Sequence, residues 1–434
     1  MTKKYLGSSS GLTLVTDAGT AFVSSKFNSG HMVGDIKLAT LSDTDDTDVT
    51  GSELIANYDF STTGNWTLES GWAITGGKLV DSAISGGSAT SDQFSMTGGK
   101  TYVLSFQVTG SGGNPTLFIR KNGVIITQRQ VPDDPSDGFY SLTFTVSATG
   151  SDYDIRVTAG NFLGSFDFIS VRLAEEDRSV NGNGLQVFGT VTKTAVATGA
   201  DLVAYSGFST SNYLEQPYNS DLDFGTGDFC VMGWIKNNAG IFDAILHRSA
   251  GSGGIYFRIK DVGQLELFAT NSYTFSSVIS GNDVVNNNQW NHVVAMRNNG
   301  VVSLYVNGNL DASTTHTNDI TFSGAVTRFG NRVDGGDVFG GSLALFRISA
   351  TAPTAEQIKK IYEDEKVLFQ DGAQATLYGT SDSVVALDFD SDEQLLRVGT
   401  SAGRSDFSGL RRVSNTTTAV TTAISSSNGM VVEQ

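Results

Sequence analysis

Short runs of alternating apolar and polar residues recur through the first half of the sequence. Residues 102–108, 140–146 and 166–173 each follow this pattern, which buries one face of a β-sheet and leaves the other face in water. Lys121-Asn122-Gly123 separates two further runs, and an Asn-Gly pair favours the tight turn of a β-hairpin. The pattern predicts an antiparallel β-sandwich over residues 52–174.

A second series of alternating runs lies further along the chain. One face of the strand that begins at Trp290 is expected to carry Trp290, His292, Val294 and Met296. Asn298-Asn299-Gly300 then reverses the chain into residues 302–306, and another Asn-Gly turn follows at 307–308. We expect these strands to belong to a second sandwich.

One segment has helical periodicity instead. Ile358, Ile361 and Tyr362 fall on one side of a helix. Thr354 precedes the first turn and Gln357 follows three residues later, which is the spacing of a capping box. This helix is predicted to pack on the second sandwich.

Composition supports a β-rich chain and excludes several function classes. The 434 residues include 50 Gly but only 5 Pro, a balance typical of many short strands joined by tight turns. The net charge of −17 repels nucleic acid. Cys230 is the only cysteine, so no intrachain disulfide forms. No apolar run is long enough for membrane insertion, and the first ten residues do not resemble a signal peptide.

Two polar segments divide the chain. Residues 43–51 begin with an acidic run that lacks apolar side chains, so we expect a solvated linker. A calcium-binding loop is the alternative, although the spacing lacks the Gly and the closing Glu of an EF-hand. Residues 175–184 form a second polar linker. These boundaries give the predicted domains 52–174 and 185–367.

The second sandwich carries a recognisable order of residues. Trp290-Asn291-His292-Val293 is followed by Leu304-Tyr305-Val306-Asn307-Gly308, an order that resembles the concanavalin A-like, laminin G or pentraxin-type family. Residues 228–235 and 339–348 are similar to its early and closing strands. The resemblance implies a lectin-like domain over residues 185–367, with a terminal helix and a ligand that meets loops at one rim, often through calcium.

Residues 331–337 are the candidate rim loop. Asn331 and Arg332 can hydrogen-bond sugar hydroxyl groups, and the carboxylates of Asp334 and Asp337 can surround a hard cation. We therefore predict that all four bind carbohydrate and that Asp334 and Asp337 also bind calcium. The alternative is an exposed turn that is acidic for solubility.

The first sandwich also resembles a known class. Residues 54–60, with Trp66 and Trp72 after them, are similar to carbohydrate-binding-module-like jelly rolls. The resemblance implies that Trp66 or Trp72 stacks on a sugar ring, because an aromatic face packs against the apolar face of a pyranose. The alternative is that both indoles pack in the core or at its rim.

We expect no catalytic activity. Glucanases of the lectin-like fold use paired carboxylates in a Glu-x-Asp-x-x-Glu arrangement, and the nearest string, at residues 175–180, lacks the final Glu. The histidines show no metal-ligand spacing; they are His31, His247, His292 and His316.

The two chain ends share a sequence pattern. Residues 14–19 are echoed by residues 398–403, which predicts two copies of a strand, a tight turn and a second strand. Such blade-like units need neighbours, so residues 1–42 and 368–434 are expected to form a β-rich, propeller-like base that oligomerises, with a trimer favoured. The Thr-rich segment 415–424 resembles tailed-phage virion proteins.

The sequence thus predicts an all-β chain in which a jelly roll and a concanavalin A-like/laminin G sandwich are inserted in a base formed by the chain ends. The favoured function is that of a phage virion protein, a tail fibre or head decoration, that displays lectin-like domains to a host-surface glycan. Its partners are then further copies of itself and other virion proteins, and it is assembled in the host cytoplasm. A bacterial surface adhesin and a polysaccharide depolymerase are the alternatives.

Overall fold

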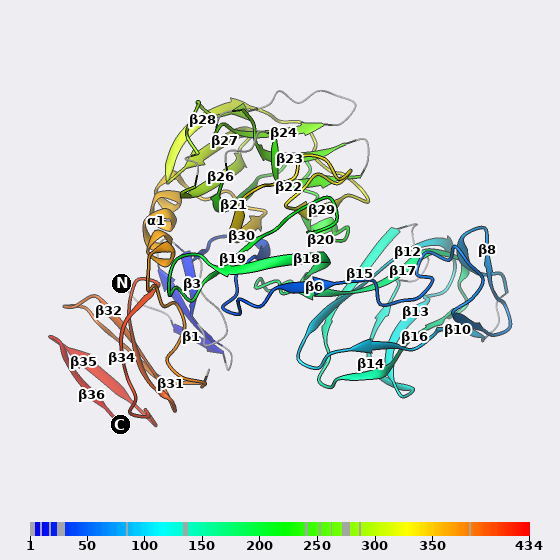
Figure 1. Cartoon of the computed structure of the whole chain (residues 1–434), viewed down its shortest axis with the longest axis horizontal. Coiled ribbons are helices and arrows are strands. Elements are labelled where there is room, and N and C mark those ends of the chain that lie inside the picture. Colours follow the sequence, from blue (N-terminus) through cyan, green and yellow to red (C-terminus); the bar gives the residue numbers. More distant parts are fainter. Residues whose placement is uncertain are drawn as a thin grey trace.

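A computed structural model describes residues 5–8, 11–16, 19–23, 31–83, 86–132, 138–238, 242–250, 253–261, 263–270, 278–285, 288–381 and 383–434. Antiparallel strands make up most of its regular structure, which confirms the predicted all-β class. Figure 1 shows a jelly roll to one side of a larger sandwich, with the small sheets of the chain ends below the latter. Within the described residues, no helix is long and apolar enough to cross a membrane.

The jelly roll has two facing sheets. The first has the order β14 (Val124–Gln130), β13 (Thr116–Lys121), β16 (Gly150–Thr158), β10 (Ser88–Ser91) and β7 (Trp66–Leu68), with β11 (Phe94–Met96) also on β16. The second has the order β8 (Trp72–Thr75), β9 (Lys78–Asp81), β17 (Leu163–Glu175), β12 (Thr101–Ser111) and β15 (Gly138–Thr145). Leu104, Phe106 and Ile155 are fully buried between the sheets, so the alternating residues form the core as predicted.

The larger sandwich also has two sheets. One contains β28 (Asn309–Thr315), β27 (Val301–Val306), β26 (Trp290–Asn298), β21 (Phe229–Lys236) and β30 (Ser342–Ser349), with β5 (Ile36–Thr40) and β19 (Val203–Ser206) on β30. The other contains β18 (Leu185–Ala195), β20 (Tyr213–Gln216), β29 (Val326–Phe329), β22 (Asp243–Ser249), β23 (Gly254–Ile259), β24 (Leu265–Thr270) and β25 (Val278–Ile279). A short helix, η1 (Ser220–Leu222), precedes β21.

The predicted helix lies on the outer side of the first of these sheets. It is α1 (Ala355–Glu365), followed by η2 (Lys366–Phe369). Thr354 and Gln357 form the predicted capping box, with reciprocal bonds of 2.8 and 3.2 Å. Ile358 and Ile361 are buried against Val294 and other residues of β26 and β21, so the apolar stripe of the helix covers that face.

The sequence-based boundary at residue 42 needs correction. β5 pairs with β30, and β6 (Val49–Gly51) pairs with the middle of β18. Residues 36–51 therefore belong to the lectin-like sandwich rather than to a base or a free linker. Since β17 also pairs with β18, the jelly roll is an insertion that leaves the larger sandwich after β6 and returns at β18 (Figure 1).

Neither predicted linker is simply solvated. The side chain of Asp43 is 23% exposed, and its Oδ2 atom lies 2.7 Å from Nζ of the buried Lys193. In the second linker, Asp177 accepts hydrogen bonds from the backbone N–H groups of Ala39 and Asn183, both at 2.8 Å. A charged residue can pack when it finds a partner, and these partners lie more than a hundred residues away or in a neighbouring turn.

The two chain ends form similar small sheets. One is β1 (Tyr5–Ser8), β2 (Gly11–Thr16), β3 (Gly19–Val23) and β4 (His31–Met32), and the other is β31 (Val384–Asp390), β32 (Leu395–Thr400), β33 (Gly403–Ser408) and β34 (Arg411–Thr416). Thr16 pairs with Gly19 as Thr400 pairs with Gly403, so the repeat has one register in both copies. Asp17 and Ala18 lie outside the described residues. A hairpin, β35 (Ile424–Ser427) and β36 (Met430–Glu433), ends the chain.

The close approach of β6 to β18 requires a glycine. A Cβ atom at Gly51 would lie 2.4 Å from the carbonyl oxygen of Val187. We predict that Gly51→Ala lowers the free energy of unfolding by about 1–3 kcal/mol, because backbone must shift to remove the overlap. Gly64→Ala is the control, since a Cβ there meets nothing within 4 Å. Urea unfolding measures both, and equal stability of the two variants would contradict the role of Gly51.

Candidate functional site

The rim loop, residues 331–337, follows β29, and the side chains of Arg328 and His247 hold its backbone. Arg328, from β29, donates hydrogen bonds from Nη1 to the carbonyl oxygens of Val333 (3.0 Å) and Arg332 (3.3 Å). Its Nε and Nη2 atoms bind the Glu215 carboxylate at 2.9 and 2.6 Å. His247, from β22, accepts a hydrogen bond from the N–H of Val333 at its Nδ1 atom (3.0 Å). The loop therefore has a fixed backbone over the β29–β22 pair.

Both predicted carboxylates bind the same guanidinium group. Arg332 Nε lies 2.6 Å from Asp334 Oδ1, and its Nη1 lies 3.2 Å from Asp337 Oδ2. The Arg332 hydrogen bond holds the pKa of the Asp334 carboxyl below its usual value. The side chains of Arg332 and Asp334 are 37% and 62% exposed. A ligand can thus reach an ordered set of charged hydrogen-bonding groups.

Three further residues complete the site. Tyr256 donates its hydroxyl hydrogen to Asp337 Oδ2 at 2.7 Å, and Arg258 Nη1 lies 3.6 Å from the same oxygen. The Arg258 guanidinium also lies 4.8 Å from the ring centre of Phe242. Phe242 is 36% exposed with a φ of +60°, a region that a bulky residue rarely adopts. An exposed aromatic ring thus lies beside the arginine and carboxylate network.

The sequence contains a signal for part of this set. Tyr256 and Arg258 alternate with the apolar Ile255, Phe257 and Ile259, so period-2 alternation places the two polar residues on the other face of β23. Tyr256 is only 3% exposed, so it supports Asp337 through its hydroxyl group rather than touching a ligand. Their approach to the rim loop depends on the pairing of β22 with β23 and β29. Phe242 has no local signal, because only its backbone conformation and exposure distinguish it.

The structure corrects the assignment of Asn331. Its side chain is fully buried, and its Nδ2 atom donates a hydrogen bond to the carbonyl oxygen of Ser209 at 2.7 Å. Asn331 therefore cannot touch a ligand directly. It supports the loop by binding the turn that precedes β20.

Trp66 and Trp72 also differ from the sugar-stacking prediction. They are 7% and 6% exposed, and both belong to the jelly-roll core. Trp66 packs on Phe60 with ring centres 5.5 Å apart, and Trp72 packs on Phe166 at 6.3 Å. A sugar-stacking platform needs an exposed ring face, so the packing alternative describes both residues.

The predicted calcium ligands are not free to share an ion. The Arg332 guanidinium binds both Asp334 and Asp337. Its positive charge repels a cation from the space between the two carboxylates. The described part of the chain has no group of three His, Cys, Asp or Glu side chains placed to hold a metal ion. The site as arranged suits hydrogen bonding to hydroxyl groups, and calcium binding stays a prediction.

Comparison with known proteins identifies the larger sandwich. Residues 207–359 match the family model described as Concanavalin A-like lectin/glucanases superfamily. The chain therefore carries a concanavalin A-like/laminin G lectin-fold domain, as the sequence resemblance implied. No curated protein sequence matches the chain.

Similar solved structures are distant. Domain 4 of AbnA, a GH43 extracellular arabinanase from Geobacillus stearothermophilus, solved with arabinotriose, is 17% identical, with 43% of this chain and 92% of that chain covered and a TM-score of 0.35. The botulinum neurotoxin serotype D binding domain is 14% identical, with coverages of 56% and 60% and a TM-score of 0.36. A heptameric SAP-like pentraxin from Limulus polyphemus is 17% identical, with coverages of 32% and 70% and a TM-score of 0.27. These likenesses do not assign a ligand to this chain.

The His247 anchor predicts a pH dependence. Burial lowers the pKa of His247 from 6.5 to about 4. Between pH 6.5 and pH 4, this histidine is therefore protonated in the unfolded chain but neutral in the folded chain. Stability therefore falls as the pH drops from about 6.5 to about 4. We predict that His247→Gln, which keeps an acceptor for Val333 but cannot titrate, reduces this loss. Urea unfolding at both pH values measures it.

His292 contributes to the same acid-induced loss of stability. Burial also lowers the pKa of His292 to about 4, so the variant retains part of the acid-induced loss. An acid-induced loss as large in His247→Gln as in the unmodified chain would contradict the proposed role of His247.

Proposed function

We propose that this chain is a non-catalytic glycan-binding protein that holds saccharides at the rim of its lectin-fold domain. The observation that carries the proposal is the exposed ring of Phe242 beside Arg258, which together with Arg332 binds the Asp337 carboxylate. An aromatic ring packs on the apolar face of a sugar, while arginine and carboxylate groups bind its hydroxyl groups. The lectin fold supports the same conclusion, although a fold alone does not define a ligand.

We further propose that the protein is displayed on the virion of a tailed phage and contributes to adhesion to a host-surface glycan. The resemblance of residues 415–424 to phage virion proteins and the paired small sheets of the chain ends support this proposal. Display of several copies suits a weak saccharide site, because the effective concentration of the second site multiplies avidity. Self-association into a trimer is part of this proposal.

A glycan array with the full chain tests the rim site. We predict that Phe242→Ala weakens binding to the best saccharide about three- to tenfold, because the stacking contact is lost. Tyr58→Ala is the matched control, since Tyr58 is 38% exposed and lies in the jelly roll. Isothermal titration calorimetry measures the affinities.

Two results would contradict the rim assignment. One is unchanged affinity in the Phe242→Ala variant, and the other is an equal loss in Tyr58→Ala. The same titration with a chelator tests calcium: an affinity that falls on chelation would require a cation that displaces Arg332 from its two carboxylates.

The virion proposal makes a separate prediction. Mass spectrometry of purified phage particles from the source of this sequence is expected to detect the chain in several copies per particle. Its absence from particles, with secretion by a bacterium instead, would favour a bacterial adhesin and leave the glycan site untouched.

A further inference from the structure

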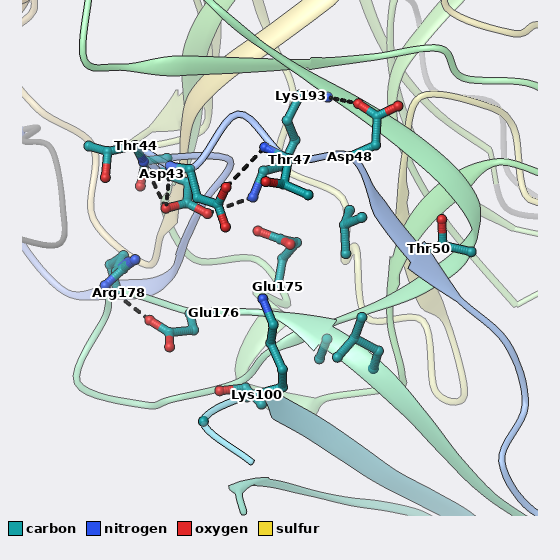
Figure 2. Close-up of a pocket in the computed structure, with 17 residues that line it drawn as sticks. Asp43, Thr44, Thr47, Asp48, Thr50, Lys100, Glu175, Glu176, Arg178 and Lys193 are labelled. Atoms are coloured by element: carbon teal, nitrogen blue, oxygen red, sulfur yellow. Dashed lines mark hydrogen bonds and ion pairs between the residues drawn. The ribbon is translucent and has the colours of Figure 1, made fainter. Parts of the chain in front are cut away.

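A cleft of about 670 Å³ lies where the jelly roll joins the lectin-fold domain. Its wall combines residues 42–45 and 47–50 and Lys193, from the lectin-fold domain, with residues 99–101, 173–176 and 178 of the jelly roll and its return segment. Figure 2 shows the labelled acidic, basic and hydroxyl side chains around this space. The volume falls within the range of about 300–1,000 Å³ that is usual for small-molecule sites.

Most residues that line the cleft are polar or charged, and Val49, Leu173 and Ala174 are the apolar side chains among them. Four threonines contribute hydroxyl groups, and no aromatic side chain is among the residues that line it. The charged residues of the lining are Asp43, Asp45, Asp48, Glu175, Glu176, Lys100, Arg178 and Lys193. A ligand for this cleft therefore makes hydrogen bonds and ion pairs rather than stacking contacts.

Negative charge remains after the ion pairs inside the cleft are formed. Lys193 neutralises Asp43 at 2.7 Å, and Arg178 neutralises Glu176 at 3.0 Å. Glu175 also interacts with Lys193, and burial raises the pKa of its carboxyl group. Asp45 and Asp48 form no ion pair in the described part of the chain, and neither does the remaining cation of the lining, Lys100.

Three carboxylates of the lining already accept hydrogen bonds from the chain. Asp45 accepts from the N–H of Thr47 (3.0 Å), Asp48 from the N–H of Lys193 (3.1 Å) and Glu175 from the Tyr205 hydroxyl (2.6 Å). Each of these bonds uses one carboxylate oxygen. Asp45 and Asp48 are exposed, so their remaining oxygens are open to a ligand, and a positively charged donor gives the stronger bond.

A single metal ion does not fit this arrangement. No three of the described carboxylates come together in a group that could hold one ion. The acceptors are instead spread over a cleft, so a ligand that satisfies them is extended and carries several donors. An acidic saccharide is excluded by the excess of negative charge.

We infer that the cleft is a second saccharide subsite, selective for sugars that carry free amino groups. This inference rests on the proposed glycan-binding function and adds a class of ligand to it. The ammonium groups pair with Asp45 and Asp48, and the threonines bind hydroxyl groups. Because both modules form the walls, an occupant also fixes the jelly roll against the lectin-fold domain.

Three matched oligosaccharides test the selectivity of the full chain. We predict that a glucosamine hexamer binds at mildly acidic pH, where its amines are protonated. Its N-acetylated counterpart is expected to bind at least about tenfold more weakly, because the charge-assisted bonds are lost. A galacturonate hexamer is expected not to bind. Equal binding of all three would overturn the selectivity.

Charge-neutral variants locate the binding site. Asp45→Asn with Asp48→Asn keeps the oxygens that accept the Thr47 and Lys193 N–H bonds but removes two charges. We expect at least about a tenfold loss of glucosamine-hexamer affinity. The control is Asp59→Asn with Asp319→Asn, which makes the same change in net charge at two exposed turns of similar geometry. An equal loss in the control would overturn the cleft site.

The rim variant separates this inference from the proposed function. Phe242→Ala is expected to leave the preference for the glucosamine hexamer over its N-acetylated counterpart unchanged, because Phe242 does not line the cleft. If Phe242→Ala abolishes that preference while the Asp45 and Asp48 variant does not, the cleft assignment fails and the rim site stands. If neither variant changes it, the cleft assignment fails as well.

Discussion

The pairing of β6 with β18 is the constraint on which the rest of the structure depends. These strands lie on opposite sides of the jelly roll in the sequence but pair within the lectin-fold domain. The chain must therefore leave that domain and return to it at one place. Gly51 permits the contact, since any larger residue would meet the backbone at Val187. The junction of the two modules brings the acidic segments 43–51 and 175–184 together. Their carboxylates form ion pairs there with Lys193 and Arg178.

Much of the fold could be predicted from local pattern. Period-2 alternation identifies the strands of both sandwiches, and the Thr354 and Gln357 pair marks the start of α1. The acidic segment at 43–51 could not be assigned in this way, because the partner of Asp43 is 150 residues away. The acidic composition of this segment indicates exposure to solvent, whereas its actual burial depends on pairing with residues that are distant in the sequence. The insertion of one sandwich in another has no local signal for the same reason.

In the candidate site, too, local sequence pattern identifies some residues and misses others. Arg332, Asp334 and Asp337 are close in sequence and form one network, as their shared loop suggests. Asn331 stands in the same loop but points inward, and Trp66 and Trp72 are core residues. Residue type alone does not distinguish an exposed aromatic ring from a buried one. Phe242 reaches the site only through the contacts of β22 and β23 with the loop.

A crystal structure of the full chain with the saccharide that binds best on the array tests the central claim most directly. The account predicts a sugar ring against Phe242, with hydroxyl groups bound to Arg332 and Asp337. A rim without bound sugar, in crystals where the saccharide occupies another surface of the lectin-fold domain, would contradict it.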